Sequence, residues 1–392
     1  MQLTPTEVLA LRMTSLLLRP TPVDAAAGDG AGADRRPGSV ADVVTWFGAM
    51  QAHDLASGLW SLGARLPRLT VTGVTAALER REALRTWPMR GTVHLVPARD
   101  ARWMLDLTGV RPLAGAAARR AYLGLSEQVA DRAVDVLAKA LAGGGRLTRA
   151  QCLDALTAAG VVSSGQLGYH LLWYASQRGV TCIAPNIGTE QTFVLLDEWV
   201  PDPHRPERDE ALGLMATRYF RSHGPTTRQD FAGWMGSTAA DAKRGIAVAG
   251  DALATVEVDG VQMLLDRALL DADRAAATGE AATVEAATAE EWLALPGFDE
   301  YLLGFKDRSL MVADEHKQAI IPGGNGVFQS TIVRDGRVVA TWKRSTLRAR
   351  TVVTVRPLTA FTAGDRGAAE AALLPYARFV ERPVEVLWDP PT

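Results

Sequence analysis

The stretch TVTGVTAALERREALRTWPMRGTVHLVP, from Thr70 to Pro97, is the most informative about the fold because its hydrophobic period changes halfway along. Residues 70–81 carry apolar side chains at helical spacing, whereas residues 82–97 read as two short strands turned at Pro88 to Gly91. The segment before them, residues 39–60, also reads as a helix. The order helix, helix, β-hairpin is that of a winged helix, a variant of the helix-turn-helix.

The same order recurs twice further along the chain. The predicted segments are helices 147–160 and 163–179 with strands 180–185 and 192–196, then helices 226–236 and 237–250 with a hairpin over 254–266. Gly160 and Gly179 are typical helix ends, and Asp259-Gly260 between alternating apolar residues is a strong hairpin signal. The pattern therefore predicts about three tandem winged-helix domains.

Two regions depart from this pattern. Residues 22–38 are rich in Ala, Gly and Asp and predict a mobile loop, whereas strands dominate from about Phe298, with another turn at Asp335-Gly336. The fold class is therefore α+β, with a C-terminal β-rich domain. The expected domains are 1–110, which holds the loop and the first winged helix, 111–205 and 206–295 with the second and third, and the β-rich 296–392.

Composition excludes several classes of protein. The chain has 392 residues, of which 47% are hydrophobic and 22% charged, and no apolar run long enough to cross a bilayer, so we expect a globular protein and no membrane partner. Its N-terminus lacks a signal-peptide pattern, which predicts a cytoplasmic location. Cys152 and Cys182 form no CxxC pair and are expected to be core thiols, and the histidines show no metal-binding spacing. We expect no metal and no cofactor.

The net charge of −2 argues against a protein that coats nucleic acid nonspecifically, but a local basic stripe is enough for binding. Acidic residues become sparse over residues 65–120 and 343–356. The candidate DNA phosphate contacts are Arg90, Lys306, Arg308, Lys343 and Arg344. A solvated surface or an ion pair, such as Arg308 with Asp307, would explain each of them equally well.

Three further positions have both a structural and a functional interpretation. Phe328 ends the glycine-rich PGGNGVF and is either a wedge between DNA base steps or part of an ordinary turn. Trp87 and Trp103 could stack on bases, but tryptophan in strands and amphipathic helices is usually core. His94 alternates with apolar neighbours, which favours a structural role.

The polar group Gln51-Ala52-His53-Asp54 lies inside the otherwise apolar and small-residue segment 46–60. A core would not select three polar side chains in four residues, so a function is indicated. On a continuous helix Gln51 and Asp54 share a face, whereas Gln51 and His53 point well apart. Either the backbone leaves helical geometry near Gln51, or Asp54 is the partner of Gln51.

Five segments in a fixed order resemble the AlkZ-like DNA glycosylases of the winged-helix HTH_42 superfamily, whose relatives include the YcaQ-type crosslink glycosylases. The segments are MQAHD, TWPMRGTVHLVPARDARWML, YFRSHGPTTRQDFAGW, FDEYLLGFKDRS and GVFQSTIVRDGRVVATW. The resemblance implies three winged helices that form a C-shaped clamp around double-stranded DNA, followed by β structure. It also implies cleavage of the glycosidic bond of N7-alkylguanine, including bulky natural-product adducts or interstrand crosslinks, and self-resistance to a DNA-alkylating antibiotic.

The family's catalytic motif is Gln-aliphatic-Gln or Gln-aliphatic-Asp, which aligns with Gln51-Ala52-His53. His53 departs from that pattern, but a histidine can hold a water and accept its proton near neutral pH. The resemblance thus implies that Gln51 orients water or sugar and His53 is the general base, with Asp54 as the competing candidate. The nearest lysine in sequence is Lys139, so no Schiff base is expected and the glycosylase should be monofunctional.

Other classes of function remain open on the sequence. Winged helices are more common in transcription regulators than in enzymes, so a ligand-responsive repressor is the first alternative and a noncatalytic DNA-damage-binding protein the second. A regulator normally dimerises on a palindrome. Three winged helices in one chain favour a monomeric clamp.

Overall fold

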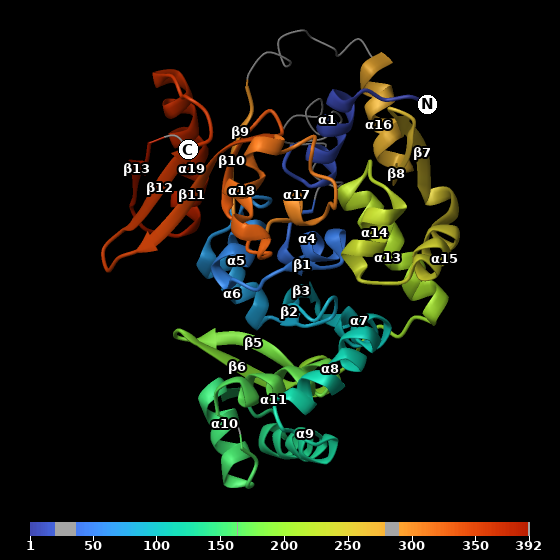
Figure 1. The fold of residues 1–392 in the computed structure, drawn as a ribbon, viewed down its shortest axis with the longest axis vertical. Helices are drawn as coiled ribbons and strands as arrows, with labels where there is room; N and C mark the ends of the chain where they lie inside the picture. Colours follow the sequence, from blue (N-terminus) through green and yellow to red (C-terminus); the bar gives the residue numbers. More distant parts are fainter. Residues whose placement is uncertain (20–36, 163, 279–289, 391–392) are drawn as a thin grey trace.

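The computed structural model describes residues 1–19, 37–162, 164–278 and 290–390. Over these ranges, helices and three separate sheets give a mixed α+β architecture, in agreement with the predicted class (Figure 1). The predicted mobile loop 22–38 lies outside the described residues except for Pro37 and Gly38. Within the described residues, no helix is both long and apolar enough to cross a membrane.

The first helix–hairpin unit differs from its prediction in one respect. Its elements are α4 (Val40–Phe47), β1 (Met50–Gln51), α5 (Leu55–Gly63), α6 (Val71–Glu79), β2 (Ala83–Thr86) and β3 (His94–Pro97). The single helix expected over 39–60 is therefore wrong. Gly48 ends α4 with φ +80, a conformation that favours glycine, and Met50 and Gln51 then pair antiparallel with Leu95 and His94.

The second unit shares a sheet with the first. Helices α7 (Ala101–Thr108) and α8 (Val110–Tyr122) lead to α9 (Glu127–Leu141), β4 (Leu147–Thr148), α10 (Arg149–Ala158), α11 (Gly165–Gln177), β5 (Thr181–Ile187) and β6 (Glu190–Leu195). Arg85 of β2 pairs with Ile183 of β5, which gives one six-stranded sheet of order β1-β3-β2-β5-β6-β4. In Figure 1 the β5–β6 hairpin therefore lies directly below β2 and β3, with α9, α10 and α11 beneath it.

The third unit forms its own hairpin. After α12 (Leu196–Trp199) it comprises α13 (Arg208–His223), α14 (Arg228–Met235), α15 (Ala239–Ala249), β7 (Leu253–Val258) and β8 (Val261–Asp266). Asp259 and Gly260 have φ of 48 and 80, the conformation of a type I′ turn, so the predicted hairpin is confirmed. Helix α1 (Pro5–Ser15) packs against α13, and α16 (Arg267–Thr278) follows β8.

The remaining residues build a five-stranded sheet of order β13-β12-β11-β10-β9. Its strands are β9 (Trp292–Leu295), β10 (Ser330–Arg334), β11 (Arg337–Thr346), β12 (Thr351–Pro357) and β13 (Val384–Trp388), with α19 (Ala363–Phe379) between the last two. The short helices α17 (Glu300–Leu303) and α18 (Lys317–Ile320) lie between β9 and β10. Asp335 and Gly336 form the predicted turn, with φ of 48 and 76.

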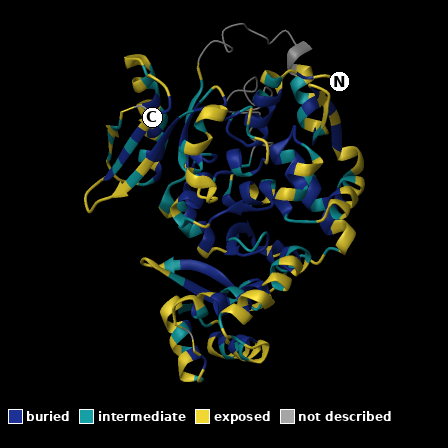
Figure 2. Cartoon of the chain, in the orientation of Figure 1, coloured by how far each residue is buried: buried dark blue, intermediate teal, exposed yellow. Residues whose placement is uncertain are grey.

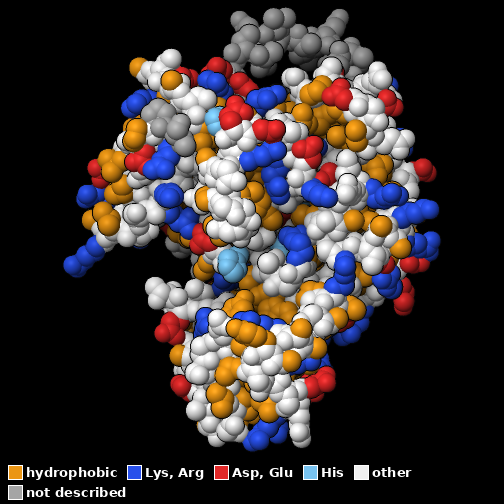
Figure 3. Space-filling view, in the orientation of Figure 1, with side chains coloured by type: hydrophobic (Ala, Val, Ile, Leu, Met, Phe, Trp, Pro, Cys, Tyr) orange, Lys and Arg blue, Asp and Glu red, His pale blue; other side chains and the backbone are white. Residues whose placement is uncertain are grey.

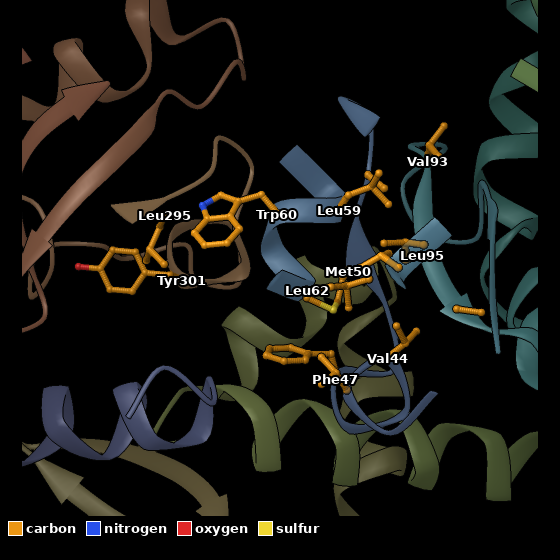
Figure 4. Close-up of a cluster of buried hydrophobic side chains, with 14 of the residues drawn as sticks. Val44, Phe47, Met50, Leu59, Trp60, Leu62, Val93, Leu95, Leu295 and Tyr301 are labelled. Atoms are coloured by element: carbon orange, nitrogen blue, oxygen red, sulfur yellow. The ribbon is translucent and has the colours of Figure 1, made fainter. Parts of the chain in front are cut away.

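Buried apolar side chains hold strand β1 in place (Figures 2 and 4). Met50 is fully buried in the same core cluster as Leu95 of β3, Trp60 of α5 and Tyr301 of α17. Cys152 and Cys182, which were predicted to be core thiols, are also buried and free. Trp87 and Trp103, which the sequence left open between base stacking and the core, are buried as well. Burial raises the pKa of Cys152 to about 12, so this thiol is not a reactive one.

Candidate active site

The Gln51 segment is extended. Gln51 lies opposite His94, its backbone N–H donates to Glu300 Oε1 at 3.0 Å, and the ladder continues with Ala52 N–H to the Val93 carbonyl at 2.9 Å. The helical spacing that would place Gln51 and Asp54 on one face therefore does not apply. Of the two alternatives that the sequence leaves open, the structure shows the first, a backbone that leaves helical geometry at Gln51.

Asp54 is occupied by structural contacts. It begins α5, where its carboxylate accepts from Ser57 N at 3.2 Å and Ser57 Oγ at 2.5 Å and pairs with Arg344 of β11. Burial alone would raise the pKa of Asp54, but the bonds from Ser57 and Arg344 outweigh it and lower the pKa. A carboxylate held this way is a weaker base than a free one.

His53 is in the opposite situation. It is exposed to solvent, and its ring lies edge-on to the Phe298 ring, at 6.2 Å between centroids. None of the described residues hydrogen-bonds its imidazole, which leaves both ring nitrogens available to a water or a substrate. His53 lies in the bend directly after the Gln51 strand, so its imidazole suits the role of a base near Gln51.

A row of rings joins His53 to the glycine-rich loop 322–328. Phe298 lies 6.3 Å from Phe328, and the Arg308 guanidinium lies 4.9 Å above the Phe328 ring. Phe298 has φ +62, so a non-glycine residue is held there in the left-handed region. Phe328 is half-buried in this row and not a freely exposed wedge.

The candidate phosphate-binding side chains differ in how many contacts they make within the protein. Lys306 and Lys343 are exposed. Arg308 donates to the carbonyl of Leu302 at 2.6 Å and, among the described residues, forms no ion pair with Asp307. Arg344 points back to Asp54, and alternation along β11 places Lys343 on the other face. Figure 3 shows Lys and Arg side chains at the outer end of the β11–β12 hairpin, where Arg348 and Arg350 are exposed.

Two adjacent buried acidic residues, neither of them a predicted site residue, support the Gln51 segment. Asp299 forms a buried ion pair with Arg65 of 2.9 Å, and both side chains are at most 2% exposed. Glu300 accepts from Gln51 N, from Trp234 Nε1 at 2.9 Å and from His223 Nε2 at 3.2 Å. The signal was present in FDEY, since two adjacent acids inside an aromatic segment need buried partners.

Burial disfavours the charged form of Glu300 and by itself would raise its pKa, yet the pKa falls to about 2. The hydrogen bond and charge of His223 are the largest opposing effect, followed by the bonds from Trp234 and the Gln51 backbone. Glu300 is therefore a buried carboxylate that ties the motif strand to α13 and α14.

His94 is structural, in line with its alternation. It is fully buried, donates from Nδ1 to the Thr92 carbonyl at 2.8 Å and accepts at Nε2 from Arg90 at 3.4 Å. Burial, and then the charge of Arg90, lower the His94 pKa to about 4. Arg90 also donates to the Trp234 carbonyl, and burial lowers its own pKa, so part of its role is to join the first unit to the third.

The buried neutral His94 predicts a loss of stability in acid. Its pKa is about 4 in the folded chain and about 6.5 unfolded, so the unfolded chain binds the proton first as the pH falls below 6.5. We expect urea unfolding to show about 2 kcal/mol less stability at pH 5 than at pH 7 from this group. Glu300 also contributes stability that is lost in acid, but at lower pH, between the ordinary pKa of a glutamate and about 2.

The matched comparison is His94→Gln against His53→Gln. The first variant should lose less stability between pH 7 and pH 5 than the wild type does, because its buried side chain no longer titrates. The second, at an exposed position, should keep the wild-type dependence. An unchanged pH dependence in His94→Gln would contradict the prediction.

Among the described residues, no group of three or more His, Cys, Asp or Glu side chains is placed to hold a metal ion. The functional groups at the site are the amide of Gln51, whose residue is only 9% exposed, the exposed His53 imidazole and the neighbouring cations. An amide that can orient a water, and an imidazole that can take its proton, suit hydrolysis.

Comparison with known proteins identifies relatives over nearly the whole chain. A sequence profile of the family described as "DNA glycosylase AlkZ-like" matches residues 44–379. A curated relative from Streptomyces sahachiroi, the "Interstrand DNA cross-link repair glycosylase", is 29% identical over 322 residues, which cover 78% of this chain and 82% of the relative. The solved structure of the S. sahachiroi DNA glycosylase AlkZ matches with a TM-score of 0.74 at 25% identity, covering 99% of this chain and 100% of that one.

Proposed function

The chain belongs to the AlkZ-like family of DNA glycosylases, and on that basis we propose that it hydrolyses the N-glycosidic bond of N7-alkylguanine in double-stranded DNA. That a relative is named as an interstrand crosslink repair glycosylase supports interstrand crosslinks as one lesion, and we propose bulky natural-product adducts as the other. Self-resistance to a DNA-alkylating antibiotic is the biological role that we propose for it, in the cytoplasm of the producing cell.

In the proposed reaction the protein has to supply only an oriented water and a base, because the leaving group is already activated. Alkylation at N7 makes the guanine cationic, so the C1′–N9 bond breaks with its electron pair moving to the base, which becomes neutral. The oxygen of a water bonds to C1′, and His53 takes the proton that the water loses, for a factor of about 10²–10⁴. Gln51 orients the water or the sugar. The observation that carries this assignment is the exposed His53 imidazole, unpaired among the described residues and two positions after the anchored Gln51.

For DNA binding we propose a monomeric C-shaped clamp of three winged helices, residues 1–110, 111–205 and 206–295, with the β-rich 296–392 beside it. The three hairpins and the helices before them support this division. Exposed Lys306 and Lys343 are the clearest phosphate contacts, because no protein carboxylate among the described residues forms an ion pair with either side chain. Four further residues contact DNA in this proposal in addition to their contacts within the protein; they are Arg90, Arg308, Phe328 and Arg344.

Excision of N7-methylguanine from a duplex tests the proposal. We expect the purified chain to release the free base and leave an alkali-labile abasic site, with no covalent adduct trapped by borohydride. A trapped adduct would show a lysine nucleophile and overturn the monofunctional mechanism. Tight binding to the lesion without base release would instead favour a noncatalytic DNA-damage-binding protein, and binding to one palindrome irrespective of damage would favour a regulator.

A further inference from the structure

The Gln51 backbone lies at the edge of a sheet. Strand β1 has only two residues and is the outermost strand of the six-stranded sheet, paired with β3. The N–H of Ala52 donates to the Val93 carbonyl within the sheet, whereas the N–H of Gln51 donates outside it, to Glu300 Oε1 at 3.0 Å. An edge strand presents N–H groups that have no ladder partner. The Glu300 carboxylate therefore takes the place that a further strand would occupy.

Glu300 is in turn fixed by the third unit. It begins α17, is 1% exposed, and accepts from Trp234 Nε1 of α14 at 2.9 Å and from His223 Nε2 of α13 at 3.2 Å. A Cβ at Gly304 would overlap the His223 ring, so α17 and α13 are in close contact. The carboxylate thus has little room to move away from the Gln51 N–H.

Helix α14 also holds the other side of the Gln51 strand. Arg90 donates to the Trp234 carbonyl and to His94 Nε2. His94 is the cross-strand partner of Gln51. Burial lowers the pKa of Arg90, and the charge of Glu300 opposes that fall, so the two charges lie near each other. Trp234 therefore reaches the Gln51 strand by two routes, one from its indole N–H and one from its carbonyl.

The place of this strand matters because of the side chain that it carries. In the proposed reaction the Gln51 amide orients a water or the sugar, and a misplacement of about 1 Å can lower a rate by about 10²-fold. Two ladder pairs, Met50 with Leu95 and Gln51 with His94, fix the register of β1. The contact on the opposite side, with Glu300, fixes how far the strand lies from the third unit.

We propose that Glu300 and Trp234 are positioning residues of the excision reaction, and that docking of the third unit through them sets the place of Gln51. The inference rests on the proposed glycosylase function. It makes the third unit a part of the active site, in addition to its proposed contact with DNA.

Two substitutions of Glu300 separate the hydrogen bond from the charge. Glu300→Gln and Glu300→Leu are close to the native side chain in size and both remove its charge, but only glutamine offers an oxygen to the Gln51 N–H. We expect Glu300→Leu to lower single-turnover excision of N7-methylguanine at saturating enzyme by about 10²-fold with duplex affinity unchanged, because the loss acts on the aligned chemical step. Glu300→Gln should keep most of the rate.

Amide hydrogen exchange, followed by mass spectrometry, gives a readout that does not depend on activity. Residues 49–52 should exchange faster in Glu300→Leu than in the wild type, because the Gln51 N–H has lost its acceptor. Glu300→Gln should stay close to the wild type. Equal exchange in the two variants, or equal rates of excision, would overturn the inference.

Asp100→Leu is the matched control. Asp100 is also buried, at 5% exposed, and it also accepts from an indole N–H, that of Trp103, at 2.9 Å. Among the described residues it makes no hydrogen bond to β1. The variant should lose stability, yet its folded molecules should excise at the wild-type rate. A comparable loss of rate in Asp100→Leu would mean that destabilisation alone explains the effect, which would refute the positioning role.

A second pair of variants decides the matter if Glu300→Leu does not fold. Trp234→Phe and Trp103→Phe each remove one indole N–H from a buried carboxylate, and both tryptophans are at most 5% exposed. We expect slower excision and faster exchange of residues 49–52 only in Trp234→Phe, and equal behaviour of the two variants is the result against the inference. Absence of excision by the wild type would contradict the glycosylase function itself, while the exchange comparison still decides whether the third unit fixes that backbone.

Discussion

Replacement of His53 by alanine is expected to lower single-turnover excision of N7-methylguanine by about 10²-fold or more while leaving DNA affinity nearly unchanged. The loss acts on the chemical step, because the general base that takes the proton of the water is gone. The side chain is exposed, and within the described residues its ring is paired with that of Phe298 alone, so its removal leaves the core intact. Rapid-quench excision with enzyme in excess, and filter binding to the same duplex, measure the two quantities.

Two controls separate the possible roles of His53 and Asp54. His53→Gln restores the commoner residue of the family's motif and should retain part of the activity if positioning of the water dominates. Asp54→Asn keeps a side-chain oxygen that can cap α5 but weakens the pair with Arg344, so we expect a modest effect. If Asp54→Asn abolishes excision and His53→Ala does not, Asp54 is the base and the assignment of His53 is wrong.

Replacement of Arg65 by methionine is expected to cost about 3–5 kcal/mol of stability. The substitution removes the partner of Asp299 inside the core, where water cannot replace it, and leaves an uncompensated carboxylate. The same change removes the bond from Arg65 to the Leu16 carbonyl, at 2.8 Å. Urea unfolding followed by tryptophan fluorescence measures the loss.

Arg99→Met is the control for that variant. Arg99 pairs with Asp202 at 2.7 Å, but the two side chains are 67% and 85% exposed, so breaking this pair should cost at most about 1 kcal/mol. A similar cost for both variants would contradict the argument from burial. Because Asp299 precedes Glu300, which binds the Gln51 backbone, Arg65→Met should also slow excision in the fraction of molecules that remain folded.

Features that depend on neighbours along the chain could be predicted from the amino-acid sequence alone. Helical spacing and the Gly160 and Gly179 ends located α10 and α11, and the Asp-Gly pairs located the β7–β8 and β10–β11 turns. Their local conformation is set within a few residues, so a sequence pattern is enough to predict it. The family motifs likewise identified the chain as a DNA glycosylase, as the profile match over residues 44–379 shows.

The geometry of the site depends instead on contacts across the fold. Residues 39–60 carry enough helical signal to predict one helix, but the pairing of Gln51 with His94, more than forty residues away, draws Met50 and Gln51 into a sheet once Gly48 ends α4. Glu300, about 250 residues from Gln51 in sequence, then fixes that strand, and Arg344 occupies Asp54. Contacts between such distant residues leave no periodic trace, so only the folded chain could show that Asp54 is paired while His53 has no hydrogen-bond partner among the residues that the structure describes.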